Sequence, residues 1–81
     1  MNYLVVFRSK SETLKFSSLL ASYGYRSAVV NTPRQISVSC GVSAKIVAGA
    51  LGVARQILTR RQFYTFAGIF AISSNNQYVK I

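Results

Sequence analysis

The chain has 81 residues, 51% of them hydrophobic, and its ten Lys and Arg residues outnumber the single acid, Glu12, to give a net charge of +9. A chain of this length supports one modest core, so we expect a single domain over residues 1–81. With no histidine, one acid and one cysteine, the sequence excludes a carboxylate pair, a zinc or Mg²⁺ site and a Cys-His dyad. We therefore expect a protein that needs no metal or cofactor and is not an autonomous enzyme.

The first predicted elements are a buried strand and a helix. Residues 3–7, YLVVF, are aromatic and β-branched, as buried strands are. Ser9 and Glu12 match a capping box, in which the serine hydroxyl and the glutamate carboxylate each accept a free backbone N–H at the helix start. The sole acid is then a helix cap and not a general acid. Gly24 ends the helix. The expected apolar stripe of this first helix consists of Phe16, Leu19, Leu20 and Tyr23.

The next segment combines a strand with an ambiguous loop. RSAVV, residues 26–30, predicts a second buried strand, and Pro33 follows its end because proline cannot donate to a central ladder. TPRQ, residues 32–35, fits a helix start with proline at the first helical position. ISVSC, residues 36–40, alternates like a strand. A short helical turn that opens into an extended loop at residues 39–41 accommodates both patterns.

The second half of the chain predicts two strands, a helix and a terminal extension. VSAKIV, residues 42–47, is the third strand, and Gly49 opens the second helix. Residues 66–72 form the fourth strand, and after a turn the tail YVKI, residues 78–81, is expected to pair with the sheet edge. The core stripe of the second helix is expected to contain Ala50, Leu51, Ala54, Ile57 and Leu58.

The element order β-α-β-β-α-β predicts the fold class. The chain mixes helices and strands (α/β in the broad sense), and the order places it in the α+β class. Two split β-α-β units most often form a ferredoxin-like sandwich. We expect an antiparallel sheet with two helices on one face. This fold hosts binders, sensors, carriers and enzymes, so it does not decide the function.

The hydrophobic segments predict a soluble, cytoplasmic protein without a membrane partner. The longest uncharged apolar run, residues 63–72, is about half of the roughly 20 residues that a membrane span needs. The apolar run at the N-terminus is too short for a signal peptide, and its basic residues follow it. A single cysteine cannot form an internal disulfide, which fits a reducing compartment.

The stretch NTPRQISVSCG, residues 31–41, holds the only proline and the only cysteine of the chain. Cys40 is the one strong nucleophile available, although a lone cysteine is more often a small buried hydrophobe. Gly41 allows close backbone approach to a ligand. Arg34 and the positive field of the chain favour an anionic sulfur. The hydroxyls of Ser37 and Ser39, with free N–H groups of a loop, can stabilise a thiolate or persulfide. One continuous helix over 33–40 would instead place Cys40 at the negative end, which disfavours the thiolate.

TPRQISVSCG resembles the TPRxISxSCG signature of a small bacterial family of selenium/sulfur carrier-like proteins, and YLVVFRSKSETLKFSSLL and FAGIFAI are similar to that family's opening and closing segments. The resemblance implies that Cys40 is the carrier thiol, which takes sulfur or selenium from a donor protein and passes it to an acceptor protein. It also implies a frame around this thiol that consists of Thr32, Pro33, Arg34, Ser37, Ser39 and Gly41.

Two other classes of function remain open. The charge of +9 with five Tyr and five Phe suits a nucleic-acid binder, although RRQFYTFAGIF lacks the glycine that the RNA-recognition signature carries after its basic residue. Most of these aromatic residues occupy positions typical of a core. A regulatory or assembly module is the other class, since an open sheet edge near YVKI invites a homodimer.

Overall fold

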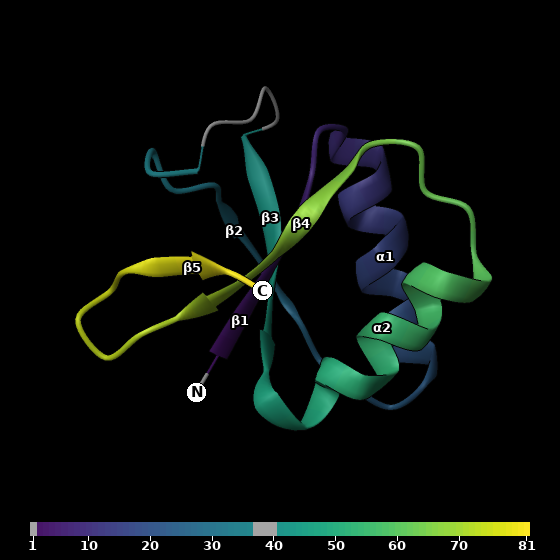
Figure 1. Cartoon of the computed structure of the whole chain (residues 1–81). Coiled ribbons are helices and arrows are strands. Elements are labelled where there is room, and N and C mark those ends of the chain that lie inside the picture. Colours follow the sequence, from purple (N-terminus) through teal and green to yellow (C-terminus); the bar gives the residue numbers. More distant parts are fainter. Residues whose placement is uncertain (1, 37–40) are drawn as a thin grey trace.

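The computed structural model describes residues 2–36 and 41–81 (Figure 1). The elements in chain order are β1 (Asn2–Phe7), α1 (Lys10–Ser22), β2 (Ala28–Asn31), β3 (Val42–Val47), the short 3₁₀ helix η1 (Ala48–Ala50), α2 (Leu51–Arg60), β4 (Phe66–Ile72) and β5 (Tyr78–Lys80). The predicted third and fourth strands are confirmed at the predicted residues, and the terminal extension pairs with the sheet as expected.

The five strands form one antiparallel sheet in the order β2-β3-β1-β4-β5. Both helices lie on the same side of this sheet, as Figure 1 shows. The fold is therefore α+β, with β1 at the centre of the sheet and β2 and β5 at its edges.

The core lies between the sheet and the helices. Val5 and Phe7 of β1 point into it because side chains alternate along a strand. The ring of Phe7 lies 5.4 Å from that of Phe16 on α1 and 5.1 Å from that of Phe63, measured between ring centroids. The predicted stripe of the second helix is confirmed, with Ala54 and the other stripe residues buried or half-buried against this core. The predicted start at Gly49 lies in η1, so Ala50 belongs to η1 and α2 begins at Leu51.

The opposite face of the sheet, which we call the open face, carries a smaller apolar cluster. Leu4 and Val6 alternate with the core residues of β1 and are buried on this face. Ile36, from the loop after β2, packs on them, as do half-buried Phe70 and Tyr78. The sheet thus buries apolar side chains on both faces, although no helix in the described parts of the chain packs on this second cluster.

Two predictions of burial are wrong. The segment predicted as a buried strand is instead an edge strand, β2, which begins at Ala28 and leaves Val29 42% exposed. Its apolar sequence does not reveal that, within the described residues, β2 pairs on one side only, with β3. Tyr23, predicted in the stripe of α1, is the C-cap residue and is 49% exposed. Thr13 takes part in the buried side of α1 instead, with Phe16 and Leu20.

The capping box is confirmed in one half only. The Ser9 hydroxyl accepts the backbone N–H of Glu12 at 3.4 Å, as predicted. The Glu12 carboxylate does not return to Ser9, whose N–H donates to the Thr65 hydroxyl at 3.2 Å. It accepts the backbone N–H groups of Tyr64 and Thr65, at 2.8 and 2.7 Å, and the Thr65 hydroxyl. Three donors in the α2–β4 loop satisfy a carboxylate better than the single N–H of a capping box.

Candidate functional site

The segment with the family signature connects β2 to β3 at one end of the sheet (Figure 1). Pairing in this hairpin runs to Asn31 opposite Val42. One step further, the backbone N–H of Thr32 donates to the carbonyl of Gly41 at 2.9 Å. This bond holds Thr32 and Gly41 side by side at the base of the loop.

Side-chain hydroxyls fix the same base to the rest of the fold. The hydroxyls of Thr32 and Ser43 lie 2.6 Å apart and share a hydrogen bond, and Ser43 is fully buried. The Thr13 hydroxyl, in the first turns of α1, donates to the Val42 carbonyl at 3.4 Å. The two ends of the loop are thus tied to both the sheet and the start of α1. Of the residues predicted to frame the thiol, Thr32 and Gly41 therefore meet at the base.

The first part of the loop is a turn, as predicted. The N–H of Ile36 donates to the Pro33 carbonyl at 3.0 Å, which makes Arg34 and Gln35 the central residues of the turn. Ile36 is only 7% exposed and anchors the turn on the open face. Arg34 is exposed. Its guanidinium is therefore accessible to an anion.

The predicted residues Ser37, Ser39 and Cys40 lie outside the described residues. The predicted extended loop at 39–41 falls there too, apart from Gly41. A shared pocket for Cys40 and Arg34 therefore stays a prediction. The described neighbours show where the segment departs from the sheet and where it returns.

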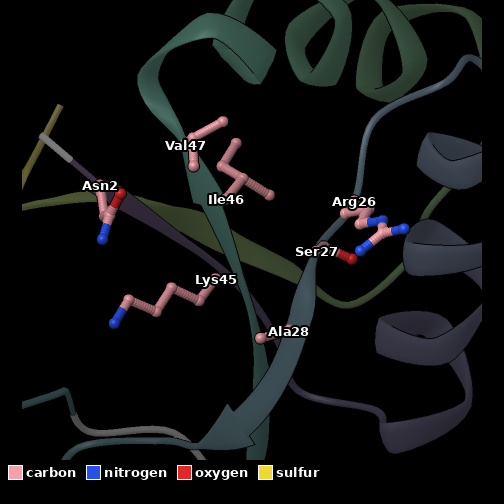
Figure 2. A pocket seen from close by; sticks show the side chains of 7 residues that line it. All are labelled: Asn2, Arg26, Ser27, Ala28, Lys45, Ile46 and Val47. Carbon is pink, nitrogen blue, oxygen red and sulfur yellow. The ribbon is translucent and has the colours of Figure 1, made fainter.

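Two hollows of the described surface lie at the opposite end of the sheet, and both are lined by Asn2 and Lys45. The first has a volume of about 410 Å³ and adds Arg26 and Ser27 to these residues. In Figure 2 the side chains of Lys45 and Arg26 extend in opposite directions, so their charges do not converge on one point. This hollow is not a ready anion site, and none of the predicted site residues lines either hollow.

The sole acid is engaged in structure and is not free for catalysis. Desolvation by burial raises the pKa of Glu12, but the hydrogen bonds from Thr65 and Tyr64 and the charge of nearby Lys15 outweigh it. The pKa of Glu12 therefore lies below its ordinary value, and the group is ionised at neutral pH. A carboxylate held in this way is a poor general acid.

The described residues offer no metal centre, since no group of three His, Cys, Asp or Glu side chains gathers among them. Within ranges 2–36 and 41–81, none of the helices has the length and apolar character required to cross a membrane. The described surface carries exposed Lys and Arg side chains, hydroxyl groups and aromatic rings.

Sequence reasoning missed one arrangement of such groups. Lys45 and Lys80 both lie on the open face, on strands separated by β1 and β4. The alternation in VSAKIV places Lys45 opposite to the buried Ala44 and Ile46, so its face could have been predicted. The position of Lys80 depends on the register between β5 and β4, which the predicted pairing of the tail does not specify.

Comparison with known proteins assigns a family. Residues 2–69 match the family model described as "Putative Se/S carrier protein-like", a range that includes the whole signature segment. Neither the search of curated proteins nor the search of solved structures gave a match. Because the family model covers most of the chain, from β1 into β4, the chain belongs to the Se/S carrier protein-like family.

Proposed function

We propose that the protein carries sulfur or selenium as a covalent adduct of Cys40, between a donor protein and an acceptor protein. The observation that carries this proposal is the family match over residues 2–69, which includes the only thiol of the chain. The missing histidine, the single acid and its use as a loop anchor all favour a carrier over an enzyme. No cofactor is needed for this chemistry.

The transfer balances as a thiol–persulfide exchange. The Cys40 thiolate attacks the outer sulfur of a donor persulfide, a new S–S bond forms at Cys40, and the donor's S–S bond breaks. The donor leaves as a thiolate, and Cys40 holds a persulfide. An acceptor thiolate then takes the outer sulfur, which returns Cys40 to its thiolate. A selenopersulfide donor would transfer selenium by the same two steps.

The described frame supports this role in two ways. Hydrogen bonds from Thr32 and Thr13 hold the base of the loop, so the loop can bind a partner while the sheet stays intact. Arg34 is exposed at the centre of the turn, where a guanidinium can pair with an anionic sulfur group. Ser37, Ser39 and Gly41 would supply hydroxyl and backbone N–H groups to the same anion.

We further propose that the fold is ferredoxin-like. The first four strands have the order β2-β3-β1-β4, all antiparallel, with one helix after β1 and one after β3. Two interleaved β-α-β units generate this order. The strand β5 then extends the sheet beyond β4.

Alkylation of the native protein tests whether Cys40 is available for exchange. We expect a small alkylating agent such as iodoacetamide to label the folded chain fully, with the Cys40→Ser variant as the unlabelled baseline. Mass spectrometry of the intact chain measures the label. Labelling that occurs only after unfolding in denaturant would show that Cys40 is a buried core thiol, and would overturn the proposal.

A further inference from the structure

A row of paired residues crosses the open face from edge to edge. The strand registers place Ala28 beside Lys45, Lys45 beside Leu4, Leu4 beside Phe70, and Phe70 beside Lys80. Paired residues on neighbouring strands point to the same face of a sheet. The row therefore presents an exposed lysine near each edge, with a half-buried aromatic ring between them.

The glycine in β4 brings one of these lysines close to the sheet. Gly68 has a φ of +148°, and a Cβ at this position would lie 2.8 Å from Cε of Lys80. The aliphatic part of Lys80 therefore crosses the open face directly over Gly68. Its ammonium group is held near the face and does not extend away from the sheet edge.

A second row and a polar hollow adjoin the first row. Asn2 is paired with Ile72, and Ile72 with Tyr78, so a second half-buried ring lies next to Phe70 and Lys80. The hollow has a volume of about 490 Å³. The residues that line it are Asn2, Lys45, Ile72, Ser73, Ser74 and Asn76. Amide, hydroxyl and ammonium groups thus lie beside two aromatic rings.

We propose that the open face binds single-stranded nucleic acid. Lys45 and Lys80 would bind phosphates, and Phe70 and Tyr78 would stack against bases. The amides and hydroxyls of the hollow would donate to and accept from base edges or sugar hydroxyls. Unpaired strands are the ligands that combine charge with exposed rings, and base stacking on aromatic side chains is insensitive to sequence. The residues of this site differ from those of the Cys40 segment, although Ile36 at the start of that segment packs on the same face. The inference goes beyond the carrier function.

Charge selects nucleic acid over the other occupants of such a face. Two copies that met through their open faces would bring the Lys45 and Lys80 groups of both together, without any acid on this face to offset them. An acidic protein could neutralise the lysines. An acidic protein, however, has no flat bases to stack on the two rings and to form hydrogen bonds with the amides of the hollow. The net charge of +9 also attracts a polyanion over a distance.

Paired charge variants test the site. Fluorescence anisotropy would follow binding of labelled oligouridylate and oligothymidylate of about 10 nucleotides, within the range of known single-strand sites. We expect Lys45→Gln/Lys80→Gln to weaken binding about tenfold at low salt, and to reduce the slope of log K against log salt by about 1.4. Arg55→Gln/Arg60→Gln, on the exposed side of α2, removes the same charge and should change affinity little.

Aromatic variants test stacking independently of charge. Tyr78→Leu should weaken binding about tenfold. Tyr64→Leu alters a ring that is 82% exposed in the α2–β4 loop and should not weaken it. Thermal unfolding of each variant shows whether the fold is kept, and Phe70→Leu is the second variant if Tyr78→Leu unfolds.

Three results would overturn the inference. The first is equal weakening by both charge variants, which would indicate only the general positive field. The second is no detectable binding near 50 mM salt, where electrostatic contacts are strong. The third is self-association of the wild type that Tyr78→Leu abolishes, which would assign the face to a second copy. Cys40→Ser should bind oligonucleotide like the wild type, so failure of the carrier proposal and failure of this one are distinguishable.

Discussion

At the scale of single residues, the position of Glu12 shows how one acid can organise a basic chain. The sequence predicts Glu12 as a helix-cap residue, whereas in the structure its carboxylate anchors the loop that joins α2 to β4. The capping hydroxyl of Ser9 could be predicted because its partner is three residues away. The contact with Tyr64 and Thr65 could not, because it joins segments that are distant in the sequence.

We expect Glu12→Gln to lower the stability of the fold at neutral pH by about 1 kcal/mol, after allowance for solvent screening of this partly exposed group. The pKa of Glu12 is lowered in the folded state, so its contribution to stability is fully present above the ordinary pKa of a glutamate and is lost as the pH falls through the lowered pKa. Denaturant unfolding of both proteins at neutral pH and near pH 2 measures this. Since Glu12 is the only acidic side chain, an equal difference at both pH values would contradict the assignment.

Arg34 gives a second prediction at the same scale. If the exposed guanidinium pairs with the anionic sulfur of Cys40, Arg34→Ala should raise the pH midpoint of Cys40 alkylation by about one unit. Arg34→Lys should recover only part of the effect, because the fork geometry is lost. The melting temperature should hardly change, since Arg34 lies in an exposed turn.

Arg55→Ala provides the control for Arg34, because it removes the same charge from the exposed side of α2. Its alkylation midpoint should equal that of the wild type. Equal midpoints in the wild type and Arg34→Ala would show that Arg34 only solvates the surface.

At the scale of elements, the β2–β3 hairpin combines a confirmed prediction with a wrong one. VSAKIV is predicted correctly as β3, because both its alternation and its flanking residues are local signals. RSAVV appears equally apolar but forms an edge strand, since burial of a strand depends on neighbours that arrive from elsewhere in the chain. The position of the loop between them, after Asn31 and before Val42, is predicted from the residues that flank it. The hydrogen bonds of Thr13 and Ser43 that anchor this loop could not be predicted from the sequence.

The base of this hairpin can be tested by a double-mutant cycle. Thr32→Val leaves the buried Ser43 hydroxyl without its partner, so we expect a loss of about 1–3 kcal/mol in the free energy of unfolding. Ser43→Ala removes the other hydroxyl. The double variant should lose clearly less than the sum of the two single changes, as measured by denaturant unfolding. Additive losses would mean that the 2.6 Å contact contributes nothing.

At the scale of the whole molecule, two features lie at opposite ends of the sheet. The loop with the family signature leaves one end of the sheet, whereas the hollows with Lys45 lie at the other end. The element order and the antiparallel sheet could be predicted from hydrophobic patterns. The lysine and aromatic row could not, because it requires the registers of four neighbouring strand pairs.

The intact mass of the native chain after exposure to a persulfide donor tests the central claim, that Cys40 carries sulfur, most directly. We predict that the wild type gains the mass of one sulfur atom, that Cys40→Ser gains none, and that an acceptor thiol removes the added sulfur. A wild type that labels with iodoacetamide yet gains no sulfur from the donor would contradict the carrier function. A gain of the same size in Cys40→Ser would contradict it equally, because the sulfur would then be held elsewhere.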